Sequence, residues 1–314
     1  MKQELGYKNV FLLPQKSIVS SRRECDTSVQ FGGHTFSMPV FPSNMKSVVD
    51  ENTCEFLASR GWFYTMHRFG VDTMKFAEHM NRKGLFVSIS TGIDLTELIR
   101  LRNYSTVVPD YLTIDVANSW SILVEPIVKQ IKDMFPDTFL IVGNVATAPA
   151  VVDLIKWGAD AIKLGIAGGR VCVTKDKTGF ARPMVSTLLE CVLVAAGNVP
   201  IIADGGISTH GDIAKALACG ATAIMAGSLF AGYDESAGDI IEIDGRRYKE
   251  YFGSASEFNK VQQRNIEGKK ILVDYKGPMS SLIQELQEDL QSSISYAGGK
   301  DLSALNPKLL IQVL

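Results

Sequence analysis

The stretch Phe139-Leu-Ile-Val-Gly-Asn-Val-Ala-Thr-Ala-Pro-Ala-Val-Val-Asp-Leu-Ile-Lys-Trp-Gly-Ala-Asp-Ala-Ile-Lys-Leu164 contains one complete unit of the expected fold. It begins with an apolar run of strand length at residues 139–142 and ends with a second one at residues 161–164. Between them, residues 148–157 have the apolar spacing of an amphipathic helix. Strand alternating with helix predicts that the two strands pair in parallel.

The same alternation extends in both directions along the chain. We expect strands at residues 39–42, 63–66, 85–89, 111–114, 139–142, 161–164, 200–203 and 223–225. We expect helices at residues 52–59, 72–81, 95–101, 123–134, 148–157 and 211–219. Eight such units fit a closed (β/α)₈ TIM barrel better than the alternative, an open doubly wound sheet with a cap. We therefore predict an α/β fold in which residues 1–314 form a single barrel domain.

Composition excludes several classes of function. The 314 residues are 46% hydrophobic and carry a formal net charge of −2, which allows a large core and leaves no basic surplus for a nucleic-acid backbone. No apolar run reaches the roughly 18 residues that cross a bilayer, and the amino terminus lacks an apolar targeting segment. We expect a cytoplasmic protein that binds neither nucleic acid nor membrane, and a small nucleotide stays open as a ligand.

One of the five cysteines stands apart. Cys172 lies in the glycine-rich loop of residues 165–179, directly after an expected strand, where a thiol faces a cleft instead of the core. Thr174 follows it and is close enough to serve a proton transfer. The odd number and wide spacing of the cysteines argue against disulfides and against a zinc site. Cys172 is therefore the best candidate for a nucleophile.

Glycines and polar residues gather where the expected strands end, which is where barrel enzymes place their chemistry. Asp204 ends the seventh strand. A carboxylate would repel a phosphate, so Asp204 is better suited to accept hydrogen bonds from a pair of ribose hydroxyls. Backbone N–H groups after strands seven and eight suit a phosphate site, although the same glycines also suit tight turns: Gly205, Gly206, Gly227 and Ser228.

The segment after the eighth strand is too long for a simple connection. Residues 232–277 contain two charged, hairpin-like runs at 240–248 and 267–274, and Asp244-Gly245 is a strong turn signal. Loops of this length in a compact barrel are usually functional flaps. Glu267 is then a candidate acid or base over the cleft, and the alternative is an exposed turn carboxylate.

Taken together, the motifs resemble a known family. They are Gly-Ile-x-Gly-Gly-Arg-Val-Cys172-x-Thr174-Lys, Ile-Ala-Asp204-Gly-Gly, Gly227-Ser-Leu-Phe-Ala-Gly, Tyr-Phe-Gly253-Ser-Ala-Ser and Glu267-Gly-Lys. This combination is similar to the family of inosine monophosphate (IMP) dehydrogenase and guanosine monophosphate (GMP) reductase. Within the family, the sequence resembles the bacterial reductase branch most. The motifs that carry this resemblance are Glu24-Cys-Asp26, Ser43-Asn-Met45, Met66-His-Arg68, Gly253-Ser-Ala-Ser-Glu-Phe258 and Ser292-Ser-Ile-Ser-Tyr-Ala-Gly-Gly-Lys300.

Two features separate the reductase branch from the dehydrogenases. Family dehydrogenases generally insert regulatory CBS modules after the second strand, whereas Met66-His-Arg68 is followed here within a few residues by the helix expected at 72–81. They also hydrolyse their intermediate with an Arg-Tyr pair on a flap, and Arg247-Tyr248 in the first hairpin is the only such dipeptide in the flap region. The pair Thr174 and Glu267 matches the reductase pattern.

The resemblance implies a mechanism and a set of ligands. Cys172 would add to C2 of GMP, ammonia would leave with help from Thr174 and Glu267, and hydride from NADPH would then give IMP. The substrate would contact Asp204, Gly205, Gly206, Gly227, Ser228, Gly253, Ser254, Ala255, Arg264 and Gly268. The cofactor would contact Ser21, Arg22, Arg68, Asp115, Val116, Ala117, Ile166 and Ala167 and, from a neighbouring subunit of a homotetramer, Ser292, Ser293 and Ser295.

The chain departs from the family pattern in the nucleophile loop. Ala167-Gly168-Gly169 replaces the usual Gly-Pro-Gly, and Lys175 replaces an arginine. In relatives, carbonyl oxygens of this loop can bind a potassium ion (K⁺). The corresponding site in this chain would be the backbone of Gly169 and Cys172, and both changes affect the loop that forms it. Two alternatives to a GMP reductase stay open: an IMP dehydrogenase, and a purine-nucleotide-binding regulator without catalysis.

Overall fold

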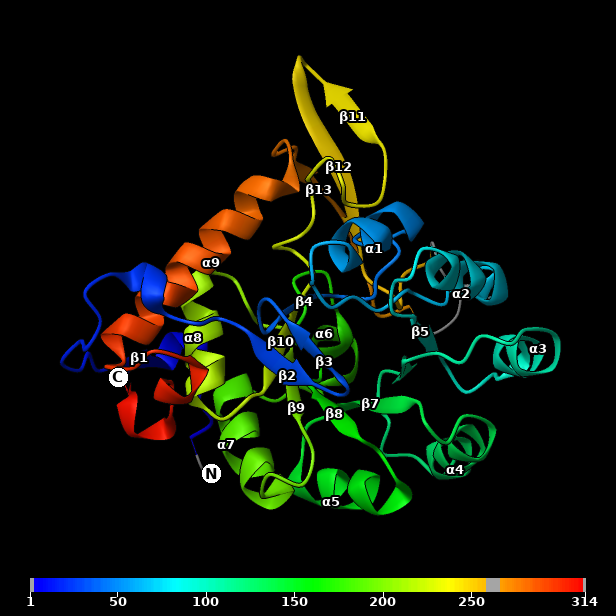
Figure 1. Cartoon of the computed structure of the whole chain (residues 1–314), viewed down its shortest axis with the longest axis horizontal. Coiled ribbons are helices and arrows are strands. Elements are labelled where there is room, and N and C mark those ends of the chain that lie inside the picture. Colours follow the sequence, from blue (N-terminus) through cyan, green and yellow to red (C-terminus); the bar gives the residue numbers. More distant parts are fainter. Residues whose placement is uncertain (1–2, 258–265, 313–314) are drawn as a thin grey trace.

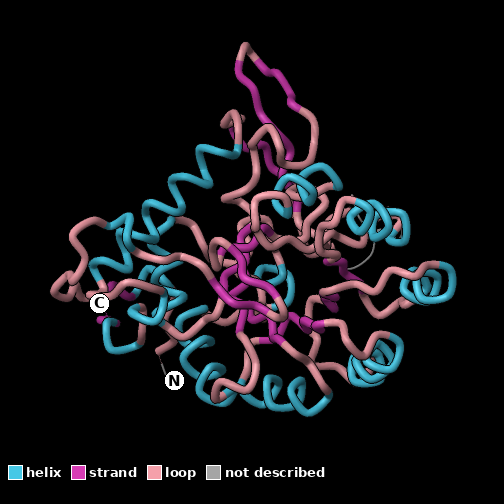
Figure 2. The backbone as a smooth tube through the Cα atoms, viewed as in Figure 1, coloured by secondary structure: helices cyan, strands magenta, loops and turns pink. Residues whose placement is uncertain are grey.

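The centre of the molecule is a curled parallel sheet. The structure is a computed structural model that describes residues 3–257 and 266–312. Its seven-stranded sheet has the order β4-β10-β9-β8-β7-β6-β5, and helices form an outer ring around it (Figures 1 and 2). The strands are β4 (Val40–Pro42), β5 (Ser88–Thr91), β6 (Tyr111–Asp115), β7 (Phe139–Val145), β8 (Ala161–Leu164), β9 (Ile201–Asp204) and β10 (Ala223–Ala226).

Helices connect successive strands as the alternating pattern predicts. They are α1 (Glu51–Ala58), α2 (Thr73–Arg82), α3 (Thr96–Tyr104), α4 (Val124–Met134), α5 (Ala148–Trp157), α6 (Thr174–Thr178), α7 (Met184–Ala195) and α8 (His210–Ala218). The helix α5 begins after Thr147, has proline in its first turn, and ends at Gly158 with a left-handed φ of 109°. Because proline suits the start of a helix and glycine its end, the local sequence fixes both ends.

The expected strand at residues 63–66 is replaced by an irregular segment beside β5. It makes one parallel bridge, between Met66 and Ile89. The Tyr64 hydroxyl donates to the Phe86 carbonyl at 2.6 Å and accepts from the Ser88 N–H at 3.2 Å. The prediction of a regular strand was wrong here because a buried tyrosine takes over backbone hydrogen bonds that a ladder would make.

A hairpin that the strand pattern did not predict closes the amino-terminal end of the barrel. It consists of β2 (Val29–Phe31) and β3 (His34–Phe36). The Phe31 ring packs against those of Tyr111 and Phe139, the first residues of β6 and β7, with centroids 5.9 and 5.1 Å apart. The Tyr111 hydroxyl also donates to the Phe31 carbonyl at 2.6 Å. Since this end is filled by aromatic side chains, the carboxyl ends of the strands form the accessible end.

The long segment after β10 forms a separate antiparallel sheet that projects from the barrel (Figure 1). It contains β11 (Ile240–Ile243), β12 (Arg246–Phe252) and β13 (Lys270–Asp274). The predicted turn at Asp244-Gly245 is confirmed, with φ of 51° and 73°. The run 267–274 does not form a hairpin of its own. Its strand β13 pairs antiparallel with β12, so β12 has β11 on one side and β13 on the other.

A buried lysine fastens this projecting sheet to the barrel. Lys249 on β12 is 3% exposed, and its ammonium donates to the carbonyls of Asp234 at 3.2 Å and Ser236 at 2.7 Å. Burial lowers the pKa of Lys249, against the opposing effect of nearby carboxylates. The three-stranded sheet is therefore anchored at its β12 strand.

The two ends of the chain meet on one side of the barrel. The strand β1 (Val10–Leu12) pairs antiparallel with β14 (Leu310–Gln312). The helix α9 (Met279–Tyr296) buries Leu282, Leu286 and Leu290 against its own chain, next to α8. The helix therefore packs on the barrel of its own chain.

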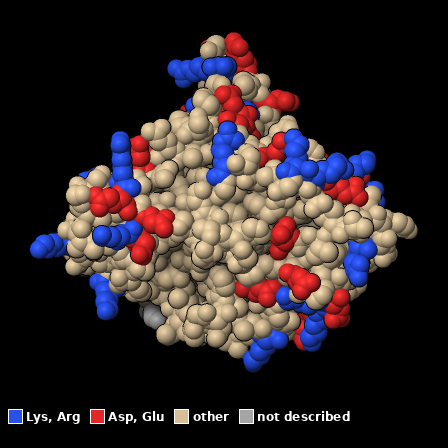
Figure 3. Space-filling model, viewed as in Figure 1, with Lys and Arg blue, Asp and Glu red and all other residues tan. Residues whose placement is uncertain are grey.

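The surface shows mixed charge on the face drawn in Figure 3, where acidic and basic side chains are interspersed. Within the described residues, no helix combines the length and the apolar character needed to cross a bilayer.

Tyr64→Phe tests the irregular strand position. Removing the hydroxyl leaves the Phe86 carbonyl and the Ser88 N–H without this partner, so we expect the free energy of unfolding to fall by about 1–3 kcal/mol. Urea unfolding measures this change. Tyr104→Phe is the matched control, because Tyr104 is 78% exposed, and it should change stability little. Equal losses of stability in the two variants would contradict the role given to the Tyr64 hydroxyl.

Candidate functional site

A large cavity opens at the carboxyl ends of the barrel strands. Its volume is about 1250 Å³, more than the roughly 300–1,000 Å³ of a typical small-ligand site. Residues predicted from sequence to form the site line it together: Arg68, Asp115, Val116, Ala117, Ile166, Ala167, Cys172, Thr174, Asp204, Gly205, Gly206, Gly227, Ser228, Gly253, Ser254, Ala255 and Glu267. Arg264 lies outside the described residues, and Gly268 is next to the lining.

Cys172, Thr174 and Glu267 form a continuous hydrogen-bonded chain. The Cys172 thiol donates to Thr174 Oγ1 at 3.2 Å, and the Thr174 hydroxyl donates to Glu267 Oε2 at 2.5 Å. Both steps run in the same direction, from sulfur towards carboxylate. The expectation that Thr174 lies close to the thiol is confirmed, and Glu267 is not an isolated turn carboxylate.

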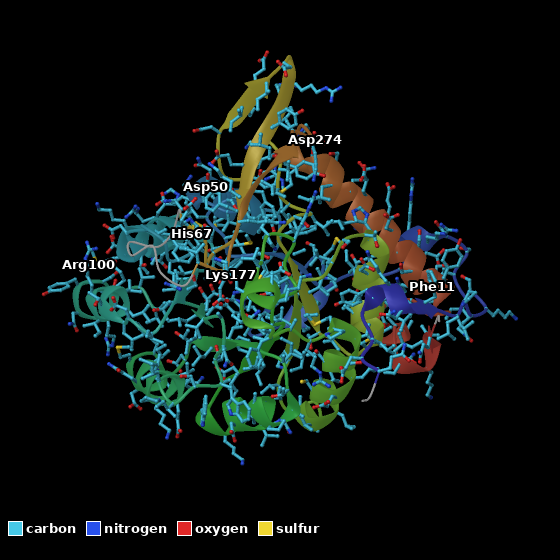
Figure 4. All side chains as sticks on the ribbon, turned by 180° about the vertical axis from the view of Figure 1, so that it is seen from behind. Phe11, Asp50, His67, Arg100, Lys177 and Asp274 are labelled. Atoms are coloured by element: carbon cyan, nitrogen blue, oxygen red, sulfur yellow. The ribbon has the colours of Figure 1, made fainter. Side chains whose placement is uncertain are left out.

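Backbone hydrogen bonds bring this glutamate to the thiol across a long sequence separation. Cys172 forms an antiparallel bridge with Gly268. Val173 donates its N–H to the Glu267 carbonyl at 2.9 Å, and Lys269 donates to the Val171 carbonyl at 2.9 Å. We call this pairing of residues 171–173 with 267–269 the clip. A side-chain bond adds to it, from Lys177 on α6 to the Ile266 carbonyl; Figure 4 labels Lys177 where the projecting sheet meets the barrel.

The other cysteines have surroundings unlike those of Cys172. Cys25, Cys54, Cys191 and Cys219 are buried, whereas Cys172 is partly exposed to the cavity. Burial raises the pKa of each of these four thiols, to about 12 for Cys191 and Cys219. Because the thiolate is the reactive form, raised pKa values and burial disfavour reaction at these four thiols.

A glycine at the end of β8 lets the nucleophile loop approach β9. Gly165 has a φ of 141°, and a Cβ there would lie 2.0 Å from the Asp204 carbonyl oxygen. Gly168 accepts the Gly206 N–H at 2.9 Å with its carbonyl oxygen. No other residue type fits position 165 without moving Asp204. The loop that carries Cys172 is thus held directly against the turn that follows Asp204.

An ion pair network that sequence reasoning missed lies at the base of the cavity. Lys163 is 2% exposed, and its ammonium donates to Asp204 Oδ2 at 2.7 Å and to Asp115 Oδ1 at 3.0 Å. Asn144 adds a hydrogen bond from its side-chain amide to Asp204 Oδ2 at 2.9 Å. Burial alone would lower the pKa of Lys163, but the two carboxylates raise it above its ordinary value, so the ammonium stays charged.

Four backbone amides expected to hold a phosphate lie at the ends of β9 and β10, in the cavity lining. The Gly205 N–H donates to the Met225 carbonyl at 3.3 Å and the Gly206 N–H to Gly168, so these two amides are already engaged. Within the described residues, the amides of Gly227 and Ser228 have no such internal acceptor.

Tyr251 lies beside these amides and was also missed. A Cβ at Gly227 would lie 2.5 Å from the Tyr251 hydroxyl. Among the described residues, this hydroxyl donates a hydrogen bond only to Met45 Sδ, a weak acceptor, at 3.9 Å. Its place two residues before the Gly253-Ser-Ala-Ser motif was the available signal in the sequence.

Comparison with known proteins assigns the chain. A family model described as IMP dehydrogenase / GMP reductase domain matches residues 4–313. The chain belongs to this family. GMP reductase of Chromobacterium violaceum is 62% identical over 315 residues, covering 100% of this chain and 99% of that protein. GMP reductase of Bacillus subtilis is 50% identical over 310 residues, covering 97% of this chain and 94% of that protein.

A solved structure of the same family supports the fold. GMP reductase from Trypanosoma brucei, in a complex with guanosine 5′-monophosphate, superposes with a TM-score of 0.90 at 22% identity, covering 100% of this chain and 96% of that chain. The predicted TIM barrel is thereby confirmed. The family model and the curated GMP reductases identify the chain as an enzyme of the IMP dehydrogenase / GMP reductase family.

The residues expected to bind a cofactor in this family fall in two separate places. Arg68, Asp115 to Ala117, Ile166 and Ala167 line the cavity. The others gather on a patch formed by the amino-terminal segment and α9, outside the cavity lining. There Arg22 donates to Ser292 Oγ at 3.1 Å and to the Tyr296 hydroxyl at 3.0 Å. Ser295 Oγ is 2.9 Å from Ser17 Oγ. Within one chain, Ser21, Arg22, Ser292, Ser293 and Ser295 therefore do not join the cavity.

Thiol labelling tests the contrast between Cys172 and the buried cysteines. With a limiting amount of iodoacetamide on the folded protein at pH 7.5, we expect Cys172 to be alkylated at least about 10-fold faster than the other four, because only it is accessible and unburied. Peptide mass spectrometry after quenching measures the rates. Labelling in urea is the control and should remove the difference. Equal rates in the folded protein would contradict the assignment of Cys172 as the reactive thiol.

Proposed function

We propose that this chain is an NADPH-dependent GMP reductase, which converts GMP to IMP and ammonia in purine nucleotide salvage. The observation that carries the proposal is the hydrogen-bonded chain from Cys172 through Thr174 to Glu267. It joins a nucleophile to a group that can take up and return a proton, which is what displacement of an amino group requires. The family membership and the GMP reductases among the relatives support the same reaction.

The direction of the two hydrogen bonds gives a route for the proton. As Cys172 Sγ attacks C2 of the guanine, the thiol proton passes to Thr174 Oγ1, and the threonine proton passes to Glu267. Glu267 and Thr174 then give this proton to the 2-amino group instead of returning it to sulfur. The C2–N bond then breaks and ammonia leaves, while the new C2–S bond remains as a thioimidate on the enzyme. The thiol proton has moved to the leaving group, so this half-reaction balances.

The nucleotide would span the cavity from the strand ends to the nucleophile. Asp204 is fixed by Lys163 and Asn144, so its carboxylate is oriented to accept hydrogen bonds from the ribose hydroxyls. The amides of Gly227 and Ser228, with the Tyr251 hydroxyl, would hold the phosphate. Other residues proposed to contact GMP are Gly205, Gly206, Gly253, Ser254, Ala255, Arg264 and Gly268.

The cavity fits a nicotinamide cofactor beside the nucleotide. It is larger than one mononucleotide needs, and it continues from Asp204 past Asp115 to Arg68. Arg68, Asp115, Val116, Ala117, Ile166 and Ala167 would hold the cofactor, which supplies the hydride that no side chain can provide. Once C2 had received that hydride, the bond to Cys172 Sγ would break, IMP would leave and Cys172 would return to its thiolate.

A neighbouring subunit would complete the cofactor site. The patch that carries Ser21, Arg22, Ser292, Ser293 and Ser295 lies outside the cavity of its own chain, so these residues would serve an adjacent copy in a homotetramer.

The projecting sheet would act as a flap of the barrel domain. Residues 232–277 carry Glu267 to the thiol only while the clip is formed. Separation of the clip would therefore withdraw the acid from the site and open the cavity.

We also propose that the backbone of Gly169 and Cys172 binds a potassium ion. The Gly169 carbonyl accepts the Cys172 N–H at 3.1 Å, which leaves one lone pair on this oxygen for an ion. No step above depends on it.

Cys172→Ser tests the proposal. With GMP and NADPH, we expect the substitution to abolish NADPH oxidation and ammonia release, because a hydroxyl at this position is a far weaker nucleophile. GMP binding, measured by calorimetry, should persist. Cys25→Ser is the matched control: Cys25 lies outside the cavity lining, its thiol donates to the Gly299 carbonyl at 3.9 Å, and a hydroxyl can keep that contact.

Three outcomes would overturn the proposal. Ammonia release by Cys172→Ser at the wild-type rate would exclude this thiol as the nucleophile. Reduction of NAD by the wild type with IMP, without oxidation of NADPH with GMP, would identify a dehydrogenase. Binding of GMP without any turnover would identify a regulator.

A further inference from the structure

Lys177 lies next to the hydrogen-bonded chain of Cys172, Thr174 and Glu267, but the reaction above does not use it. It is a residue of α6, the helix that begins with Thr174, and its side chain is exposed where the projecting sheet meets the barrel (Figure 4). Its ammonium donates to the carbonyl of Ile266, the residue before Glu267, at 2.5 Å. A lysine ordered on one carbonyl gives up conformational freedom, so the segment that it holds is where we looked for a function.

The peptide bond between Ile266 and Glu267 is held at both of its polar ends. Lys177 holds the Ile266 carbonyl, and the Glu267 N–H donates to the Ala255 carbonyl at 3.0 Å. A trans peptide bond is planar, and its carbonyl and N–H point in opposite directions. Two partners on opposite sides therefore fix the plane of this peptide, and with it the direction in which the Glu267 side chain leaves the backbone.

The first turn of α6 supplies three of the contacts to residues 266 and 267. At the start of the helix, the Val173 N–H donates to the Glu267 carbonyl at 2.9 Å. The Thr174 hydroxyl donates to Glu267 Oε2 at 2.5 Å. Lys177 follows Thr174 by three residues, which places both side chains on the same face of the helix. One helical turn thus holds the glutamate by its carboxylate, by its own carbonyl and by the carbonyl before it.

Lys177 provides a contact that the clip lacks. The clip pairs residues 171–173 with residues 267–269, so its backbone hydrogen bonds act on Glu267 and on the residues after it. Among the described residues, the bond from Lys177 is the only hydrogen bond to Ile266. Without it, the peptide bond before Glu267 would keep one of its two polar partners, and the carboxylate could turn away from Thr174.

The short helix α6 fixes the position of Lys177 itself. The Lys177 N–H donates to the Val173 carbonyl at 3.0 Å. The helix ends at Gly179, which has a left-handed φ of 78° and donates its N–H to the Lys175 carbonyl at 3.0 Å. Because glycine adopts this conformation readily, the helix stops directly after Lys177 and Thr178 and keeps the lysine beside the Glu267 segment.

We propose that Lys177 is a positioning residue for Glu267, which holds the peptide bond before the glutamate so that the carboxylate stays on the proton route from Cys172. This rests on the proposed function, in which Glu267 takes up the thiol proton and gives it to the leaving amino group. Proton transfer needs hydrogen-bond distance, so loss of the Lys177 contact would slow ammonia release. GMP binding uses other groups of the cavity and would be retained.

Single-turnover measurements test the proposal. With enzyme in excess over GMP, we expect Lys177→Met to release ammonia about 3- to 10-fold more slowly than the wild type, which is the effect of losing one hydrogen bond. The dissociation constant of GMP, from titration calorimetry, should change by less than about 2-fold. Lys177→Arg keeps a cationic donor and should recover most of the rate. Lys156→Met is the matched control and should behave like the wild type, because Lys156 is a 70% exposed lysine on α5 outside the cavity lining.

A double-mutant cycle separates positioning of the glutamate from a general structural role. If Lys177 acts through the carboxylate, Lys177→Met should slow ammonia release little further in a Glu267→Gln background, where the rate is already low. If Lys177 only supports the loop, the two losses would multiply.

The proposal fails on any of three results. The first is ammonia release by Lys177→Met at the wild-type rate, and the second is a loss of GMP affinity as large as the loss of rate. The third is a double variant in which the two losses multiply. Absence of ammonia release by the wild type would instead contradict the proposed function, so the two failures are distinguishable.

Discussion

The clip between residues 171–173 and 267–269 is the constraint on which the site depends. Its backbone hydrogen bonds join the loop after β8 to the base of β13, so that Thr174 and Glu267 meet although they are far apart in the sequence. Without this pairing the barrel still presents Cys172, but the thiol has no carboxylate at the end of its proton route. In the proposed mechanism, catalytic competence therefore depends on the contact between the projecting sheet and the barrel.

Lys163 gives the opposite side of the cavity its rigidity. Three strands of the barrel sheet contribute to one ion network, because Asp115 ends β6, Lys163 lies in β8 and Asp204 ends β9. A buried ammonium between two carboxylates is stable only if all three stay in place, since loss of either partner leaves a charge uncompensated at low dielectric. Asp204, proposed to bind the ribose, and Asp115, proposed to contact the cofactor, are thus held by the same side chain.

Sequence patterns predicted the parts of the structure that are encoded locally. Alternating strands and helices indicated the barrel, and the glycine-rich loop identified Cys172, because such signals need only neighbouring residues. Lys163 was missed because a lysine inside a short apolar run gives no sign of its partners. The hairpin β2–β3, the irregular segment at 63–66 and the pairing of β13 with β12 depend on tertiary contacts. The separation of Arg22 and Ser292 from the cavity likewise appears only in three dimensions.

The central claim is that a covalent bond forms between Cys172 Sγ and C2 of the purine. The most direct measurement is intact-protein mass spectrometry after incubation with GMP alone, followed by peptide mapping. The account predicts a protein heavier by GMP less ammonia, with the added mass on the peptide that contains Cys172, and loss of this species when NADPH is added. Steady turnover of GMP with no adduct on that peptide, even after rapid acid quenching, would contradict it.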